Sequence, residues 1–387
     1  MNFLICFVEA LKLGLVSFGG PVAHLAYFRE AYVNKLKWLS DEKFGELLAV
    51  CQFMPGPASS QLGASIGYER GGWLGALGAW LGFTLPSVVL MILFVTSMGL
   101  LDEMIGSSWI HGLKIVAVAV VANAVLGMQK KLCPELKGMF IAGIVAVLLI
   151  VFKAPWLQPL LILLGGVLGV ILYNEGSSKA DCKKVEIKHP GVALFVLASF
   201  VIAMMFISLM SFSDDEPTMV TGLIKTGAMV FGGGHVVLPL LEAETVAKGI
   251  MSQEQFLAGY GLAQAVPGPM FTFGAYIGGL VGINGSVWLG AAVGTVAIFL
   301  PGMILLTIGM PIWNAYKQIA WVKAGLKGAS ASVVGLIFAA LIYMLRSGVI
   351  TNVLEAIVAI VLALIVYKKL LPVWMVVLIG AGIGFAL

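Results

Sequence analysis

The sequence predicts an all-α polytopic membrane protein made of two inverted repeats, each with broken, re-entrant half-helices, and a linking transmembrane helix between them. Three observations support this fold class. Hydrophobic residues make up 60% of the 387 residues and charged residues 11%, which is too little polar surface to enclose a soluble core. Several apolar stretches are long enough to cross a bilayer. One unit also occurs twice in the chain.

The apolar stretches recur along the whole chain, whose mean hydropathy is +1.04. A hydrocarbon core of roughly 30 Å is crossed by about 20 helical residues, and an open sheet cannot span lipid. The lipid bilayer is therefore the expected solvent. The predicted spans are 72–99, 109–129, 136–152, 155–173, 191–212, 286–313, 324–345, 351–367 and 371–387.

The repeated unit is marked by a Gly-Gly break, a Pro-Gly-Pro break and a later proline. The matching segments are FGGPVAHL at 18–25 with FGGGHVVLPL at 231–240, QFMPGP at 52–57 with QAVPGP at 264–269, and Pro86 with Pro301. These matches divide the chain into an N-terminal repeat at 1–174, a cytoplasmic loop with the linking helix 191–212 at 175–216, and a C-terminal repeat at 217–387.

Segments on either side of each break are too short to span a membrane, so each pair is predicted to enter and leave on the same side. Broken helices at matching places in two halves are typical of secondary transporters, whose site lies between the repeats. The predicted pairs are 2–19 with 21–38, 41–54 with 57–69, 217–233 with 235–248, and 252–266 with 269–282.

The distribution of basic residues predicts the orientation of the chain. If the basic loop 29–43 is cytoplasmic, most of the 23 Lys and Arg residues fall on that side. The equivalent loop 242–256 is acidic and is expected outside, so the repeats lie upside down to each other. Span 191–212 has no counterpart and inverts the second repeat. The N-terminus is predicted inside and the C-terminus outside.

Two lysines stand at the same distance before the Gly-Gly breaks, Lys12 in ALKLGLVSFGG and Lys225 in LIKTGAMVFGG. A cation within a membrane helix costs roughly 2.5–3.5 kcal/mol, so it is expected to face a cavity, a counter-charge or a substrate. The alternative is that each side chain extends to the headgroups. Glu9 is the one nearby carboxylate for Lys12, and its equivalent is Gly222. An anionic substrate would supply the missing charge.

The breaks themselves are candidate anion sites. A helix that begins at a break presents free N–H groups and about half a positive charge, and Pro21, Pro57 and Pro269 suit the first helical position. The carbonyl ends of the preceding half-helices oppose an anion unless they are angled away, which the sequence leaves open. The candidate residues are Gly19, Gly20, Pro21, Gly56, Gly232, Gly233, Gly234 and Gly268.

Polar side chains gather around the Pro-Gly-Pro breaks. Their hydroxyls and amides can donate to an oxyanion, or they can cap the half-helices and satisfy freed backbone groups. They are Gln52, Ser59, Ser60 and Gln61 in the first repeat, with Gln264 and Thr272 in the second. His24 and His235 are candidates for proton coupling or simple interior histidines. Arg29 is a candidate gating residue or a topology determinant.

The segments FGGPVAHLAYFREAYV, QFMPGPASSQLGASIGY, FGGGHVVLPLLEAETV and QAVPGPMFTFGAYIGG together resemble the signature segments of the chromate transporter family, over nearly the whole chain. The resemblance implies a transporter in the cytoplasmic (inner) membrane of bacteria or archaea that exports chromate. It implies export driven by the membrane potential or a proton gradient, with sulfate as the similar oxyanion. Alternating access is expected from the two inverted repeats. The family's marked positions fall on Gly19, Gly20, Pro21, His24, Arg29, Gln52, Pro55, Gly56, Pro57, Gly232, Gly233, Gly234, Gln264, Pro267, Gly268 and Pro269.

Two other functions stay open, an oxyanion-conducting channel and a sulfate transporter. An enzyme is not expected, because the sequence has no HExxH, no Gly-x-Ser-x-Gly, no paired cysteines and no carboxylate dyad in its spans. We expect no cofactor, no metal site and no nucleic-acid partner. The expected partners are chromate or sulfate and the lipid bilayer, and a homodimer is compatible with a chain of 40.9 kDa.

Overall fold

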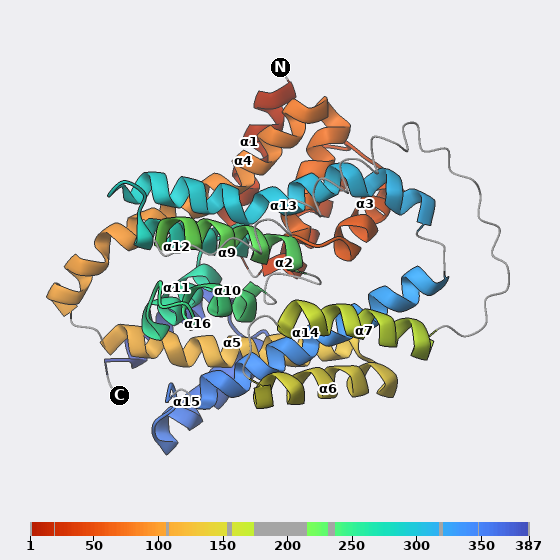
Figure 1. The fold of residues 1–387 in the computed structure, drawn as a ribbon. Coiled ribbons are helices and arrows are strands. Elements are labelled where there is room, and N and C mark those ends of the chain that lie inside the picture. The colour runs from red at the N-terminus through yellow and green to blue at the C-terminus, as the bar shows by residue number, and fades with distance from the viewer. Residues whose placement is uncertain are drawn as a thin grey trace.

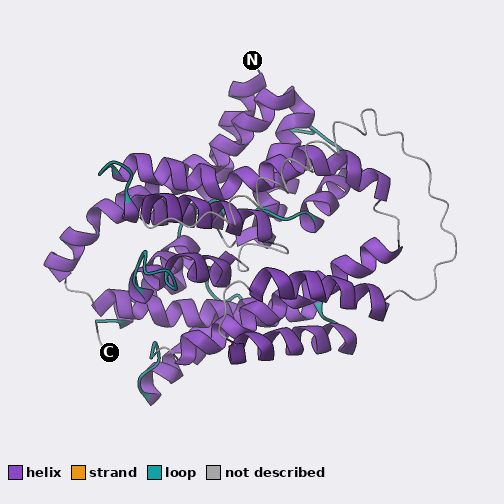
Figure 2. Cartoon of the chain, in the orientation of Figure 1, coloured by secondary structure: helices purple, strands orange, loops and turns teal. Residues whose placement is uncertain are grey.

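The computed structural model describes most of both repeats. Within the described residues the regular structure is helical and contains no strand (Figure 2), so the predicted all-α fold class is confirmed. The linking helix expected at 191–212 lies outside these residues. The structure describes residues 2–18, 20–105, 108–152, 157–173, 215–230, 237–316, 320–346 and 348–385.

The N-terminal repeat breaks at the two places that the sequence marks. Helix α1 ends before the Gly-Gly break, and α3 ends before the Pro-Gly-Pro break. The helices are α1 (Asn2–Val16), α2 (Gly20–Phe28), the π-helix η1 (Arg29–Lys35), α3 (Asp41–Phe53), α4 (Ala58–Ile105), α5 (Ser108–Leu132), α6 (Leu136–Phe152) and α7 (Leu157–Tyr173).

The C-terminal repeat follows the same order of elements. Helix α11 ends before the second Pro-Gly-Pro, and a short 3₁₀ turn follows it. The helices are α9 (Asp215–Met229), α10 (Val237–Thr245), α11 (Gln253–Ala265), η3 (Met270–Thr272), α12 (Phe273–Val281), α13 (Val287–Tyr316), α14 (Ala320–Arg346), α15 (Val353–Tyr367) and α16 (Val373–Ile383).

Helix α4 is two helices joined by a glycine turn. Gly71 has φ −149° and ψ 20°, and Gly72 has φ 63° and ψ −152°. Residues that have a Cβ atom rarely adopt the backbone conformation of Gly72. The half-helix predicted to end at residue 69 and the span predicted to begin at 72 are therefore separate rods, as expected.

Four described helical stretches are long and apolar enough to cross a membrane. Several shorter apolar helices accompany them, including α6 and α15, and together these helices agree with a multi-pass membrane protein. The four stretches are Ala58–Gly99, Ser108–Lys130, Val287–Thr307 and Ala320–Arg346.

The helices assemble into two bundles, and each bundle takes equivalent helices from both repeats (Figure 1). The hairpin bundle holds the broken helices: α1 packs on α4, and α9 packs on α13 and α10. The span bundle holds α5, α6, α7, α14, α15 and α16, with α14 against α6 and α7 and with α5 against α15 and α16. Both Pro-Gly-Pro breaks and the start of α2 at Gly20 lie in the hairpin bundle, so the candidate site lies there too.

Candidate anion-binding site

The two repeats exchange a pair of equivalent backbone hydrogen bonds at their breaks. The N–H of Gly56, in the first Pro-Gly-Pro, donates to the carbonyl of Val230 at 2.7 Å. The N–H of Gly268, in the second, donates to the carbonyl of Ser17 at 3.0 Å. Ser17 and Val230 both directly precede the phenylalanine of a Gly-Gly break. Such a reciprocal arrangement is the signature of approximate two-fold symmetry between the repeats.

We call these two contacts the first crossing, around Ser17 and Gly268, and the second crossing, around Val230 and Gly56. Both glycines have positive φ angles, +97° for Gly268 and +123° for Gly56. A Cβ on Gly56 would stand 2.8 Å from Gly302 Cα, and one on Gly268 would stand 2.7 Å from Ser87 Oγ. Glycine is therefore required at both crossings for conformation and for space.

The second crossing is held by an amide side chain. Gln61 Nε2 donates to the carbonyl of Pro55 at 2.9 Å and to the carbonyl of Gly302 at 2.8 Å. These bonds tie the first Pro-Gly-Pro to α13 of the other repeat. The Oε1 atom of Gln61 is buried without a hydrogen-bond partner, so the side chain keeps a free acceptor at this crossing.

The first crossing contains a buried histidine. His24 is 1% exposed, and its Nε2 lies 3.2 Å from the carbonyl of Ser17. The ring meets Phe83 edge-on, with the centroids 5.2 Å apart. A carbonyl oxygen only accepts, so Nε2 carries the proton in the neutral ring and Nδ1 is left as an acceptor. Nδ1 has no partner, so it is a buried acceptor that the protein itself leaves unused.

Buried polar atoms without partners concentrate in the segments that form the crossings. A buried hydroxyl without a hydrogen bond costs about 1–3 kcal/mol, so such atoms call for a ligand, a water or an ion. Of the nine such atoms in the described part of the chain, six belong to these segments. They are Ser17 Oγ, His24 Nδ1, Ser60 Oγ, Gln61 Oε1, Thr84 Oγ1 and Thr226 Oγ1.

The crossings also provide hydrogen-bond donors to the carbonyl groups at the ends of the first half-helices. The carbonyl of Ser17 accepts from both Gly268 N–H and His24, and that of Val230 accepts from Gly56 N–H. Carbonyls that already accept hydrogen bonds oppose an anion less than free ones. Helices α2 and α4 begin beside them, at Gly20 and Ala58. The arrangement therefore favours negative charge more than open carbonyl ends would.

The predicted polar residues of the Pro-Gly-Pro breaks lie at or beside the crossings. Ser60 and Thr272 occupy equivalent positions and are 1% and 0% exposed. Thr272 Oγ1 donates to the carbonyl of Pro269 at 2.8 Å, a helix-start role, whereas Ser60 Oγ has no partner. Ser59 and Gln264 are buried, and Gln264 Nε2 lies 3.5 Å from Met270 Sδ. Gln52 is half-buried.

The two predicted lysines differ in their surroundings. Lys12 lies on an exposed face of α1, with its side chain 64% exposed, and pairs with Glu9 at 2.6 Å. Leu15 and Val16 share that exposed face. Lys225 is half-buried and makes no ion pair within the described residues. It precedes Thr226, one of the residues with an unpartnered hydroxyl. Their shared role at a substrate site stays a prediction.

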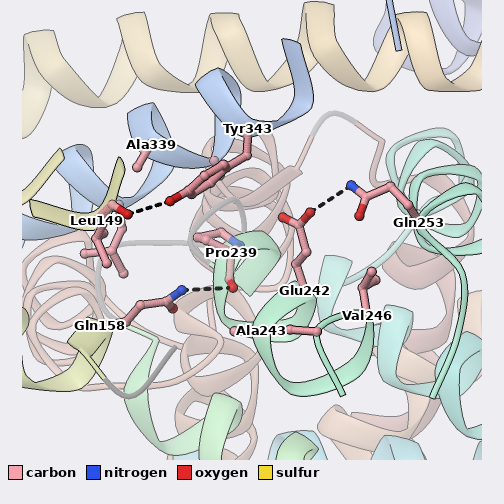
Figure 3. Close-up of a pocket in the computed structure, with 12 residues that line it drawn as sticks. Leu149, Gln158, Pro239, Glu242, Ala243, Val246, Gln253, Ala339 and Tyr343 are labelled. Carbon is pink, nitrogen blue, oxygen red and sulfur yellow. Dashed lines mark hydrogen bonds between the residues drawn. The ribbon is translucent and has the colours of Figure 1, made fainter. Parts of the chain in front are cut away.

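Arg29 stands at the exposed end of α2. Its Nε donates to Asp41 Oδ1 at 2.7 Å, and this bond and the carboxylate charge raise the pKa of Arg29. The equivalent pair in the second repeat is Glu242 with Gln253, joined at 2.8 Å. That pair lines a cavity of about 260 Å³ between α10 and the span bundle (Figure 3).

Of the remaining predicted site residues, the structure describes the backbone of Gly20 and Pro21. Gly20 begins α2 with φ +74° and has open space where a Cβ would stand, and Pro21 follows it in the helix backbone. The described residues contain no group of three or more His, Cys, Asp or Glu able to hold a metal. Gly19, Gly232, Gly233, Gly234 and His235 lie outside the described residues.

Several residues of the crossings escape the sequence prediction. In the sequence, Ser17, Thr84 and Thr226 are ordinary small polar residues of apolar segments. The order of apolar residues in such a segment does not show which face of the helix is buried against other helices. Ser87 and Gly302 carry a clearer signal, since each directly follows one of the matching prolines, Pro86 and Pro301.

Comparison with known proteins decides the family. The sequence model of the family described as Chromate transporter matches residues 4–170 and 217–385, one match for each repeat. The chain belongs to the chromate transporter family. This is a family of transporters, and both of its matches include a Gly-Gly break and a Pro-Gly-Pro break, so each repeat is one family domain.

Relatives within the chromate transporter family align over both repeats. A chromate transport protein of Cupriavidus metallidurans is 26% identical over 97% of this chain and 90% of its own length. One of Pseudomonas aeruginosa is 26% identical over 87% of this chain and 80% of its own. An uncharacterised transporter of Methanocaldococcus jannaschii is 28% identical over 98% and 93%. No solved structure matches the chain.

Proposed function

We propose that this chain is a secondary transporter that moves a tetrahedral oxyanion, chromate with sulfate as the similar second ion, out of the cytoplasm by alternating access between its repeats. The observation that carries the proposal is the concentration of unpartnered buried hydroxyls at the two crossings, because a hydroxyl can donate to an anion whereas Gln61 Oε1 and His24 Nδ1 only accept. Both crossings join the repeats, so a ligand held there would contact both halves, as expected of a transporter with repeated halves.

The chemistry of the crossings suits a dianion. Hydroxyl groups of Ser17, Ser60 and Thr226 can each donate one hydrogen bond, and the N-termini of α2 and α4 add partial positive charge. Lys225 supplies a full charge close to Thr226 in the sequence. Such a site recognises charge and tetrahedral shape, and it distinguishes chromate from sulfate only weakly, because both are dianions of similar size. The names of the bacterial relatives favour chromate.

The membrane potential is a sufficient driving force for export. A potential of 100 mV contributes about 2.3 kcal/mol for each charge moved, or about twice that for a dianion leaving a cell that is negative inside. His24, with its free Nδ1, is a candidate for proton coupling in addition. We place the protein in the cytoplasmic membrane with its N-terminus inside and its C-terminus outside, from the charge distribution of its loops.

The test uses hydroxyls that have no protein partner. We expect Ser60→Ala and Thr226→Val to lower chromate flux in proteoliposomes about tenfold or more, because each removes one donor, worth about 1.5–3 kcal/mol to a charged ligand. Neither change is expected to lower the unfolding temperature, since no bond within the protein is lost. Thr295→Val is the matched control, because the hydroxyl of Thr295 already donates to the carbonyl of Ala291 at 2.7 Å.

The outcomes separate the alternatives. Unchanged flux in both variants, with normal flux in the control, would remove the crossings as the binding site. Faster flux for sulfate than for chromate would make the protein a sulfate transporter. Unitary currents in planar bilayers would identify a channel, since a carrier that changes conformation in each cycle gives none that can be resolved.

A further inference from the structure

Two charged positions outside the crossings are repeated in both halves of the chain. Lys114 ends the tripeptide GLK at 112–114, and Lys327 ends the same tripeptide at 325–327. Glu42 and Glu254 each lie two residues after a serine that caps a half-helix, Ser40 for α3 and Ser252 for α11. The repeat therefore provides two equivalent lysine and glutamate pairs, Lys114 with Glu254 and Lys327 with Glu42.

Only the first pair is closed among the described residues. Lys114 Nζ lies 2.7 Å from Glu254 Oε1, and the lysine side chain is 14% exposed. The bond joins α5 of the span bundle to the start of α11 in the hairpin bundle, so it crosses from one bundle to the other. The hydrogen bond from Lys114 and its positive charge lower the pKa of Glu254, which favours the ionised carboxylate.

The second pair is open. Lys327 lies 3.9 Å from Glu135 and over the ring of Tyr173 at 5.1 Å, both outside the hairpin bundle. Glu42 is exposed and makes no ion pair in the part of the chain that the structure describes. Lys327 thus holds a loose, exposed partner in place of the glutamate that the repeat pairs with it.

The helices around the two pairs show the same asymmetry. Helix α11 packs against α5 and α16, and α10 contacts α14. Their equivalents, α3 with α14 and α7 and α2 with α5, form no comparable packing among the described residues. In Figure 1, α10 and α11 lie between the bundles, while α3 stands away from α7 and α14.

In each repeat a side-chain hydrogen bond joins the second half-helix of the first pair to the next half-helix, Glu242 with Gln253 and Arg29 with Asp41. The span bundle covers this bond in the C-terminal repeat only. Glu242 and Gln253 meet in the cavity lined also by Gln158 and Tyr343 of the span bundle (Figure 3). The equivalent Arg29 and Asp41 side chains are 55% and 58% exposed. The lysine and glutamate pairs, the helix packing and the bonds between half-helices therefore all show the two bundles in contact at one end and apart at the other.

We propose that Lys114 with Glu254 forms the closed gate of this conformation, and that Lys327 with Glu42 forms the equivalent gate at the opposite side of the membrane, which closes when the first opens. The inference rests on the proposed transport function. Two copies of one unit in two conformations can exchange those conformations, and the exchange turns the access of a central site from one side to the other. With the acidic loop 242–256 outside, Lys114 and Glu254 form the outer gate.

The gate is tested by cross-linking on a background in which Cys6, Cys51, Cys133 and Cys182 are replaced by alanine. A lysine and a glutamate in an ion pair can hold their Cα atoms further apart than a disulfide spans, so a reducible bis-methanethiosulfonate reagent is used. The outer pair is Lys114→Cys with Glu254→Cys, and the inner pair is Lys327→Cys with Glu42→Cys. Lys130→Cys with Tyr367→Cys, within the span bundle and joined at 2.6 Å in the native chain, is the control.

We expect both gate pairs to cross-link, each in a different part of the population. Removing the outer ion pair by Lys114→Gln should raise inner-pair cross-linking about two- to fivefold, the effect of losing a partly exposed ion pair. The control pair should be unchanged. The single change Lys114→Glu should reduce transport, and adding Glu254→Lys should restore it. Cross-linking either gate should stop flux, and reduction should recover it.

Two results would overturn the proposal: an inner pair that never cross-links, with or without Lys114→Gln, or full flux through protein cross-linked at the outer pair. Failure of the transport proposal looks different. If wild-type protein carries neither chromate nor sulfate but the inner pair still cross-links in response to Lys114→Gln, the gate proposal is supported and the proposed substrate is wrong. If chromate flux is normal and the inner pair does not cross-link, the transport proposal is supported and the gate proposal is wrong.

Discussion

At the scale of single residues, the crossings depend on backbone atoms more than on side chains. Ser17 and Val230 contribute carbonyls, and Gly56 and Gly268 contribute N–H groups. A side chain at either glycine would meet the other repeat before the hydrogen bond could form. The glycines therefore act through the access that they give to the backbone.

We expect Gly56→Ala to lower the free energy of unfolding by at least about 1–2 kcal/mol, from the positive φ alone. The new Cβ would also overlap Gly302 Cα at 2.8 Å. Thermal unfolding of the detergent-solubilised protein measures the effect. Gly45→Ala on α3 is the control, because nothing lies within 4 Å of its Cβ. Equal unfolding temperatures for the two variants would show that the second crossing contributes no stability.

The lysines give a second prediction at this scale. Lys225→Gln should reduce chromate flux more than Lys12→Gln, because Lys225 is half-buried without an ion pair in the described residues, whereas Lys12 pairs with Glu9 on an exposed face. Flux in proteoliposomes under an imposed potential compares them. An equal loss in both variants would instead support a site flanked symmetrically by the two lysines.

At the scale of elements, the half-helices are short and rely on their caps. Ser252 accepts from Gln255 N–H at 3.1 Å, and Gln255 Oε1 accepts from Ser252 N–H at 2.9 Å. This reciprocal capping box starts α11 at the residues that carry Glu254 toward α5. Ser40 caps α3 in the equivalent place, by accepting from Lys43 N–H at 3.2 Å. The start of each half-helix is thus fixed by its own sequence.

Ser252→Ala should cost about 1 kcal/mol of stability, the usual cost of losing an N-cap hydroxyl. Ser252→Thr retains a hydroxyl at the cap and should cost much less. Chemical denaturation of the two variants in detergent measures the difference. If alanine and threonine behave alike at this position, the capping box does not control the start of α11.

The elements were predictable from the sequence because each Gly-Gly or Pro-Gly-Pro cluster separates two segments that are too short to span a membrane, whereas single residues such as Pro86 stay inside a helix. The breaks at Gly20, Gly56 and Gly268 and the division of α4 near Gly72 follow from residue type and segment length alone. The crossings were not predictable, because a constant spacing shows which positions are equivalent but not that each loop contacts the opposite repeat. The exposure of Lys12 was hidden for a similar reason: an apolar membrane helix has no polar side to reveal its orientation.

At the scale of the whole molecule, two equivalent sets of helices adopt unequal arrangements. The span bundle closes on α10 and α11 and leaves α2 and α3 apart. One chain thus displays both arrangements of its repeated unit at once, and in the proposed alternating-access cycle the movement is the difference between its own halves.

Net chromate efflux should follow the imposed membrane potential. With two charges moved, about 4.6 kcal/mol becomes available for each 100 mV, so an inside-negative potential should accelerate efflux and an inside-positive potential should oppose it. Radiolabelled chromate in proteoliposomes with a potassium gradient and valinomycin measures this, with protein-free liposomes as the control. Flux that responds to a pH gradient and ignores the potential would indicate proton coupling, with His24 as the first residue to test.

The reciprocal hydrogen bonds also affect how the protein is made. Gly56 emerges from the ribosome long before Val230, and Ser17 long before Gly268, so the N-terminal half enters the membrane with neither crossing formed. During synthesis that half must keep a buried N–H and a buried carbonyl without their final partners. Its breaks are completed only when the C-terminal half arrives in the opposite orientation. Membrane insertion of the second half is thus the step that finishes folding the first.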